Sequence, residues 1–198
     1  MTGPVLLSVM KPPPVRHGEV LRYARAAEGD AVAEALLSEL LPAAEGVLTY
    51  RVAFRELPVT KTDCGLTVGP LRISSSSLGA HLCGAKSALV LAATVGVGLD
   101  RLILRYEKAS PARALLLDAL GSERVESLLD AFTAEREAEG YRLTSRFSPG
   151  YLDLPLSLQK DILPLLDGEK LLGLSLGSRL LLSPQKSVTA IVGVLGRG

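Results

Sequence analysis

The side chains best suited to chemistry stand close together in one short segment, residues 146–151. The segment holds Arg146, the Pro149-Gly150 pair and Tyr151. Proline restricts its own φ and the residue before it, while glycine reaches positive φ and lets a ligand approach the backbone, so the pair predicts a turn. A guanidinium binds a carboxylate through two parallel hydrogen bonds, and a tyrosine ring stacks on flat rings or faces a cation. The segment therefore predicts a turn that presents an arginine fork and an aromatic face to one small molecule.

A ligand with a carboxylate, a purine and a positive centre suits these groups, and S-adenosylmethionine (AdoMet) has all three. The pattern Arg-x-x-x-Gly-Tyr, then an amphipathic helix, then residues 183–193, resembles the AdoMet-binding activation domain of cobalamin-dependent methionine synthase. The short stand-alone bacterial proteins of that family also show the pattern found at residues 153–160. A weaker resemblance runs back through residues 93–96 and 117–122. The strong likeness thus lies in the C-terminal part of the chain.

The resemblance implies a role for each of four residues. Arg146 would hold the AdoMet carboxylate, Tyr151 would bound the pocket, and Gly150 with neighbouring backbone groups would contact the adenine. In that family an acidic residue on the helix before the arginine motif contacts the AdoMet amino group, and Asp130 is its counterpart here. The sulfonium leaves as a neutral thioether, so no general acid is needed and the chain contributes orientation rather than a catalytic side chain.

The resemblance also implies a partner that carries cobalamin. When cobalamin in a methionine synthase core is oxidised to inactive Co(II), a reductase supplies one electron and AdoMet methylates the Co(I) form. We expect the corrinoid domain and the homocysteine site to belong to another protein. The two cysteines here fit no spacing for the zinc-thiolate site that homocysteine needs. The one His-x-x-Gly, at His81, has Gly79 where a cobalamin-ligating motif has an orienting aspartate. The predicted function is AdoMet binding in support of reductive methylation of cobalamin in a separate methionine synthase, with no metal site in this chain.

Two alternatives from other classes stay open. One is a docking module for a corrinoid protein that has lost AdoMet binding, and the other is an independent AdoMet-dependent methyltransferase. The long synthases have Pro-Ala-Cys after Gly-Tyr and a later tyrosine against the ligand, whereas here residues 152–154 are Leu-Asp-Leu and no tyrosine follows Tyr151. The docking module predicts no AdoMet binding, and the methyltransferase predicts turnover without a corrinoid partner.

Composition narrows the class of protein. The 198 residues suit one domain, and 47% hydrophobic with 22% charged residues is an ordinary globular balance. A net charge of +1 gives no basic field for nucleic acid, and the longest apolar run, residues 88–99, is too short to span a membrane. With no basic region before the apolar start, we expect no signal peptide and a cytoplasmic protein. Cys64 and Cys83 are expected to be buried free thiols.

Local patterns predict an α+β fold: a curved, mostly antiparallel sheet with helices packed around it, as in the methionine synthase activation domain. We expect one domain over residues 1–198, with N-terminal helices and a hairpin in residues 1–73 and the core with the AdoMet motif in residues 74–198. An apolar run predicts a central strand over residues 87–94. The main helices are expected over residues 16–27, after an N-cap at Asp30, over 99–108, from 110 to 139, and over 155–166. The helix from 110 to 139 is expected to be broken or bent near Gly121-Ser122. Further strands are expected over residues 5–9, 48–57, 71–73, 172–176, 179–182 and 187–195. More β structure is expected over residues 59–67, with a turn at Asp63, Cys64 and Gly65.

Two small motifs invite a ligand and have plainer interpretations. The serine run at residues 74–77 is typical of a loop that caps a short helix, although a phosphate-binding role was weighed as well. Gly96 and Gly98 follow the central strand, but Arg101 stands where a dinucleotide fingerprint needs its third glycine. A classical NAD or FAD site is therefore excluded, and the glycines remain only a hint of ligand contact.

Overall fold

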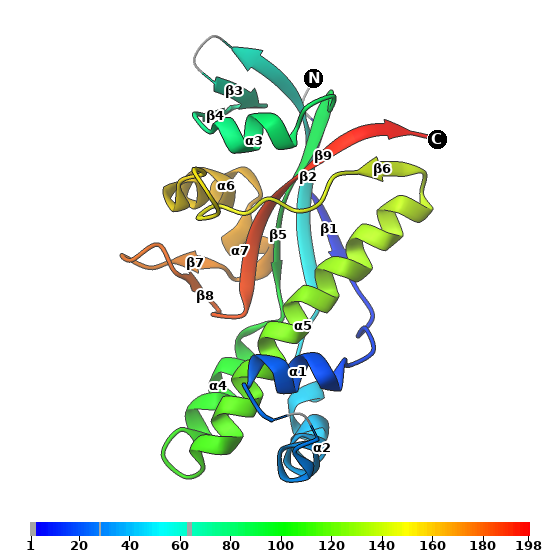
Figure 1. Cartoon of the computed structure of the whole chain (residues 1–198). Helices are drawn as coiled ribbons and strands as arrows, with labels where there is room; N and C mark the ends of the chain where they lie inside the picture. The colour runs from blue at the N-terminus through cyan, green and yellow to red at the C-terminus, as the bar shows by residue number, and fades with distance from the viewer. Residues whose placement is uncertain (1–2, 28, 63–64) are drawn as a thin grey trace.

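A seven-stranded sheet organises the computed structural model, which describes residues 3–27, 29–62 and 65–198 (Figure 1). Its strands pair antiparallel in the order β4-β3-β2-β5-β9-β6, and β1 pairs with the first half of β2. The strands are β1 (Leu6–Val9), β2 (Arg51–Thr62), β3 (Gly65–Val68), β4 (Leu71–Ile73), β5 (Ser87–Thr94), β6 (Tyr141–Leu143) and β9 (Ser187–Arg197). The predicted α+β fold is confirmed, whereas the turn expected at Asp63 and Cys64 lies outside the described residues.

Strand β5 is the centre of the sheet and is covered on both faces. It pairs along its whole length with β2 on one side and β9 on the other. Leu89 and Leu91 enter one hydrophobic core, while Val90 and Ala92 enter the other. Burial of both faces explains why this strand appears in the sequence as an unbroken apolar run rather than an alternation. The predicted central strand over residues 87–94 is confirmed with the same bounds.

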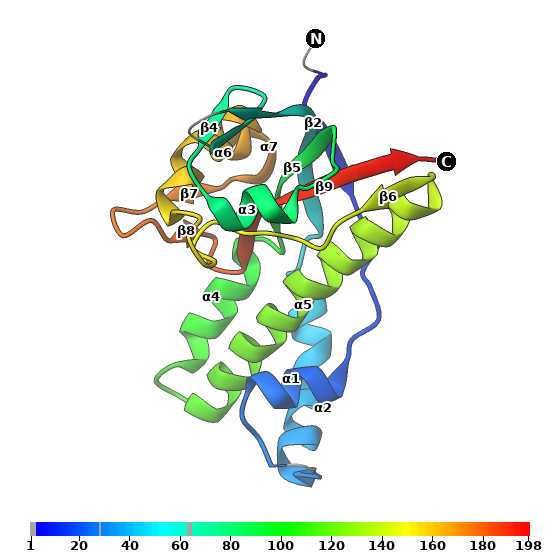
Figure 2. The same ribbon diagram turned by 45° about the horizontal axis from the view of Figure 1, so that its top comes forward.

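Four helices cover one face of the sheet, and the long helix α5 runs across it (Figures 1 and 2). Asp30 caps its helix as predicted, because its carboxylate accepts hydrogen bonds from the backbone N–H groups of Val32 and Ala33. The first helix is shorter than predicted and ends before Arg25, which adopts a positive φ of 56°. The four helices are α1 (His17–Tyr23), α2 (Ala31–Glu45), α4 (Val97–Tyr106) and α5 (Pro111–Ala138).

Helix α5 is continuous, so it is not broken near Gly121. Gly121 allows close packing at this point. A Cβ atom at this position would lie 2.5 Å from Leu99 Cδ2 and 2.7 Å from Lys186 Cγ. The missing side chain lets α4 and the start of β9 approach the middle of α5, which brings three segments of the site region together.

A buried ion pair on α5 ties down the N-terminal segment. Arg124 Nε donates to Glu123 at 2.6 Å, and both side chains are fully buried. The other Arg124 nitrogens donate to the backbone carbonyls of Pro13 and Pro14 at 2.6 and 2.8 Å. Burial alone would raise the pKa of Glu123, but hydrogen bonds from Arg124 and Ser127 outweigh it and hold that pKa below its ordinary value. The Glu123–Arg124 pair therefore holds the N-terminal segment that contains Pro13 and Pro14 against α5. We call this part of the chain the proline segment.

The opposite face of the sheet carries short helices and a separate hairpin. Gly173 adopts a positive φ of 69° and ends α7, so the chain turns before Ser175. The strand predicted over residues 172–176 is thus wrong for its first half, and the one predicted over 179–182 reaches only its last residue. These elements are α3 (Ser76–His81), the 3-10 turn η1 (Leu156–Leu158), α6 (Gln159–Leu165), α7 (Gly168–Leu172), and the hairpin of β7 (Ser175–Leu176) with β8 (Leu182–Ser183).

Candidate functional site

The arginine segment is anchored to the sheet by Phe147. Its N–H and C=O exchange hydrogen bonds of 2.9 Å with Ile191 of β9, and its ring is buried. The predicted turn follows at once, since Tyr151 N donates to Ser148 O at 3.1 Å and Gly150 N donates to Leu154 O at 2.8 Å. The turn is thus held rigidly against the strand that closes the core.

Gly150 occupies a conformation that disfavours any other residue, with a φ of +92°. A Cβ atom there would also lie 3.2 Å from Leu156 Cδ1. We expect Gly150→Val to lower the free energy of unfolding by about 2 kcal/mol, because a β-branched residue is strained at positive φ. Urea denaturation measures this. Gly18→Ala is the matched control, since Gly18 lies in α1 with open space around it, and equal stability of the Gly150 variant and wild type would contradict the prediction.

Arg146 is the centre of an ion cluster rather than a free fork. Its Nη1 lies 2.8 Å from Asp130 Oδ1, and its Nη2 lies 2.8 Å from Glu126 Oε2. Asp130 is shared, because its other oxygen lies 3.0 Å from Arg16 Nη1. Arg16 in turn reaches Glu123. The structure therefore brings Arg146 and Asp130 together, as the resemblance implies, and adds Glu126 and Arg16, which sequence reasoning did not place there.

The aromatic member of the segment points outward. Tyr151 is 58% exposed and meets Phe147 edge-on, with ring centroids 5.2 Å apart. Tyr151 and Gly150 are not among the described residues that line a large cavity next to the turn, whereas Ser148 and Pro149 are. The turn accordingly forms part of the cavity wall with its first half and presents its second half to solvent.

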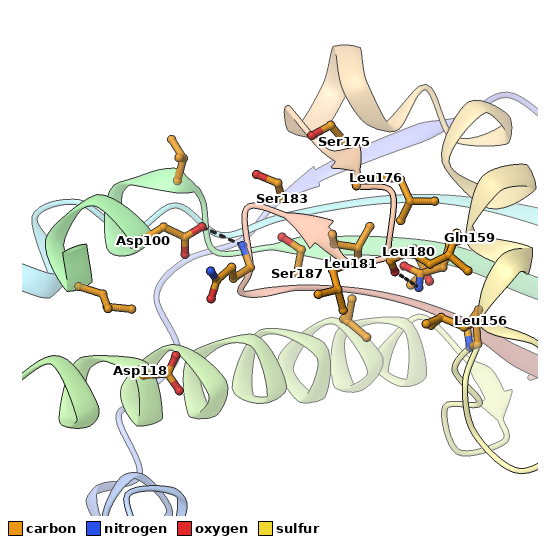
Figure 3. Close-up of a pocket in the computed structure, with 18 of the residues that line it drawn as sticks. Asp100, Asp118, Leu156, Gln159, Ser175, Leu176, Leu180, Leu181, Ser183 and Ser187 are labelled. Carbon is orange, nitrogen blue, oxygen red and sulfur yellow. Dashed lines mark hydrogen bonds between the residues drawn. The ribbon is translucent and has the colours of Figure 1, made fainter. Parts of the chain in front are cut away.

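That cavity has a volume of about 950 Å³ and lies between α4, the start of β9 and the β7–β8 hairpin (Figure 3). Leucines of the hairpin form an apolar side, and Asp100 and Asp118 approach it from α4 and α5. Gln159 holds the hairpin in place by donating from Nε2 to Leu180 O at 3.3 Å. A smaller cavity of about 270 Å³, lined partly by Glu126, shares Gln185, Ser187 and Val188 with the larger one. The two cavities thus share part of their lining at the start of β9.

Sequence reasoning missed most of this cavity, because the hairpin has no clear strand pattern. Gly96 and Gly98, which follow β5, gave a hint of ligand contact in the sequence, but packing explains them. A Cβ on Gly96 would lie 2.4 Å from Thr49 Oγ1, and one on Gly98 would lie 2.3 Å from Val47 O. Both glycines allow close packing against neighbouring residues. They also lie at the start of α4 and so place Asp100 at the cavity.

The serine run caps a helix with outside help. Ser75 Oγ accepts from Leu78 N as predicted, and the Asp153 carboxylate accepts from Ser75 Oγ at 2.6 Å and from Ser76 N at 2.7 Å. Ser76 Oγ and the Ser77 N–H also reach this carboxylate. The donors that a phosphate would need already serve Asp153, so the capping interpretation is the one supported.

The same contacts make Asp153 an acid-sensitive link between α3 and the arginine turn. Hydrogen bonds from Ser75, Ser76 and Ser77 hold the pKa of Asp153 well below its ordinary value of 3.8. A depressed pKa means that the unfolded chain binds the extra proton, so the stabilisation is present above pH 3.8 and is lost as the pH falls further. We expect Asp153→Ala to lower the urea midpoint at pH 7, with a difference from wild type that narrows between about pH 5 and pH 2. A difference independent of pH would contradict this role.

The remaining candidates are structural. His81 lies 2.7 Å from Ser145 O through Nε2, and its ring packs against Phe147. Cys83 is exposed, so its predicted burial is wrong; it follows the end of the short helix α3 and points away from the core. Cys64 lies outside the described residues. In the described part of the chain no group of three or more His, Cys, Asp or Glu side chains is placed to hold a metal ion.

Comparisons with known proteins give different results for the sequence and for the fold. No family model matches the chain, and no curated protein matches it. Among solved structures it is similar to the MetH reactivation domain bound to AdoHcy, with a TM-score of 0.69 over 96% of this chain and 78% of that chain. The chain has the fold of the MetH reactivation domain. The sheet and helices are shared, but most side chains differ, because the identity to that domain is only 15%. Among the described residues no helix is long and apolar enough to cross a lipid bilayer.

Proposed function

We propose that this chain binds AdoMet and supports reductive methylation of cobalamin held by a separate methionine synthase core. The observation that carries the proposal is the ion cluster of Arg146, Glu126 and Asp130 on the fold of the MetH reactivation domain. Glu126 lines the smaller cavity, and Ser148 and Pro149, which follow Arg146, line the larger one. The MetH domain of that structure binds AdoHcy, which differs from AdoMet in lacking the transferred methyl group and the positive charge on sulfur.

The ion cluster is complementary to a free α-amino acid group. An arginine next to two carboxylates offers a cation to the ligand's carboxylate and anions to its ammonium. In the proposed complex Arg146 turns its fork to the AdoMet carboxylate, and Glu126 or Asp130 takes the amino group in its place. The exchange keeps every charge paired, because ligand groups replace the contacts of 2.8 Å that the cluster makes within itself.

The cavity suits the nucleoside end of the same ligand. Its volume of about 950 Å³ falls in the range of small-molecule sites, and the leucines of the β7–β8 hairpin provide apolar surface for an adenine ring. Both cavities are lined by Gln185, Ser187 and Val188. In the proposed complex one extended ligand crosses the start of β9 and reaches both. Bound AdoMet supplies a methyl group on a sulfonium, and the chain's residues orient that group toward the partner and keep water away.

Titration of the purified protein with AdoMet by calorimetry tests the binding step. The second step is tested by adding the protein, AdoMet and a reductant to a cognate cobalamin-bearing core that has lost activity by oxidation. We expect saturable AdoMet binding, restored methionine synthesis, and no methionine from the isolated chain with AdoMet and homocysteine. Methionine made by the isolated chain, or no rescue of the oxidised core, would contradict the proposal.

One observation favours a second candidate, a docking module that no longer binds AdoMet. Both ends of the Arg146 fork are already satisfied by the chain's own carboxylates, and Tyr151 and Leu152 beside it are exposed. Such a module would bind the corrinoid partner with the same affinity in the presence and absence of AdoMet. An AdoMet-dependent change in that affinity excludes this alternative.

A further inference from the structure

Asp100 carries a negative charge at the cavity that no cation of the described chain neutralises. It lies in the first turn of α4 and lines the cavity (Figure 3). Its Oδ2 accepts the backbone N–H of Gln185 at 2.8 Å, whereas its Oδ1 is shielded from solvent and has no hydrogen-bond partner among the described residues. A carboxylate with one buried oxygen that has no hydrogen-bond partner favours the approach of a positive charge.

The other charges of the cavity do not cancel it. Asp118 is paired, because Lys186 Nζ lies 2.8 Å from its Oδ1. Glu107 and Arg101 also line the cavity; both are exposed and of opposite sign. The charges of Asp118 and Lys186 sum to zero, and so do those of Glu107 and Arg101. The charge of Asp100 remains, beside an apolar wall that weakens screening by water.

We infer that Asp100 makes this cavity selective for a positively charged ligand centre, and that it distinguishes the sulfonium of AdoMet from the neutral sulfur of AdoHcy. The inference rests on the proposed function for the identity of the ligand. A sulfonium has no N–H or O–H to donate, so a nearby uncompensated carboxylate is a direct means of recognising it. The same carboxylate would release the demethylated product, because the positive charge leaves with the methyl group.

The test compares affinities for AdoMet and AdoHcy in wild type and in Asp100→Asn. Asparagine keeps an oxygen for the Gln185 N–H, so we expect the fold to persist, with a circular dichroism spectrum like that of wild type. We expect wild type to bind AdoMet more tightly than AdoHcy. In the variant the ratio of the two affinities should fall about tenfold, because AdoMet binds more weakly. Asp161→Asn is the control, since it removes one acidic charge from an exposed position on α6 away from the cavity. An unchanged preference in Asp100→Asn overturns the inference.

A second probe separates this inference from the proposed function. If wild type binds neither AdoMet nor AdoHcy, the proposed function fails and the charge selectivity is decided with benzyltrimethylammonium against neutral benzyl alcohol. The backbone amide of Gln185, which donates to Asp100, serves as the reporter in ¹⁵N-resolved NMR titrations. A shift of this amide with the cation in wild type, reduced in Asp100→Asn, supports the selectivity without AdoMet. Equal responses to the cation and the alcohol overturn it.

Discussion

Arg146→Ala is expected to raise the dissociation constant for AdoMet by at least tenfold while the protein stays folded. Loss of a charged, doubly hydrogen-bonded contact costs about 2–5 kcal/mol of binding free energy. The loss to folding is small, because Arg146 is 25% exposed and Glu126 and Asp130 face solvent once it is gone. Arg146→Lys is expected to bind poorly as well, since an ammonium cannot reproduce the planar fork.

Calorimetry with Arg113→Ala provides the matched control for Arg146→Ala. Arg113 forms the same kind of fork, with two bonds of 2.9 Å to Glu39, at the opposite end of α5. This variant should bind AdoMet like wild type. An unchanged dissociation constant in Arg146→Ala would remove the ion cluster from the binding site.

Glu123→Ala should cost about 3–5 kcal/mol of unfolding free energy, because it leaves Arg124 as a buried cation without its partner. Both side chains are fully buried, and Glu123 is also the acceptor for Ser127. The Pro13 and Pro14 carbonyls still bind Arg124 in the variant, but they carry no formal charge. The Glu45 carboxylate also remains, at 3.9 Å from Arg124 Nη1, which is too far for a hydrogen bond. Urea denaturation followed by circular dichroism measures the loss.

Two further variants identify the cause of that loss. Glu126→Ala removes a half-exposed carboxylate one turn further along α5 and should change stability by less than about 1 kcal/mol. The double change Glu123→Leu with Arg124→Met replaces the pair by apolar groups and should recover most of the loss. If Glu123→Ala unfolds at the wild-type urea concentration, the buried pair does not hold the proline segment.

The sequence predicted those elements that are determined by residues close together in the chain. The unbroken apolar run of residues 87–94 could only be satisfied by a strand covered on both faces, and the Asp30 cap depends on amide groups two and three residues away. Gly121 shows the limit of such reasoning. Its position in the middle of a helix suggests a break, but its cause is the approach of Leu99 and Lys186, which no local pattern reveals.

The same limit holds at the candidate site. Arg146 was named from its residue type and neighbours, and Asp130 from the resemblance. The pairing of the fork with Glu126, however, depends on how the extended segment lies along α5. Asp153 and the serine run were both noticed, but they are 78 residues apart and their contact exists only in the folded chain. Asp100 was passed over because an acidic residue in the first turn of a helix usually serves that helix alone.

The position of β9 has a consequence for how the chain folds during synthesis. β9 lies between β5 and β6, although both are made before it. Ser187 Oγ at its start bonds Thr94 Oγ1, which precedes it by 93 residues. Until residues 187–197 emerge from the ribosome, the most apolar strand of the sheet keeps one edge open, with unpaired backbone groups ready to join another chain. Pairing over so long a separation is also slow, so changes in β9 should reduce the yield of folded protein more than they reduce its final stability.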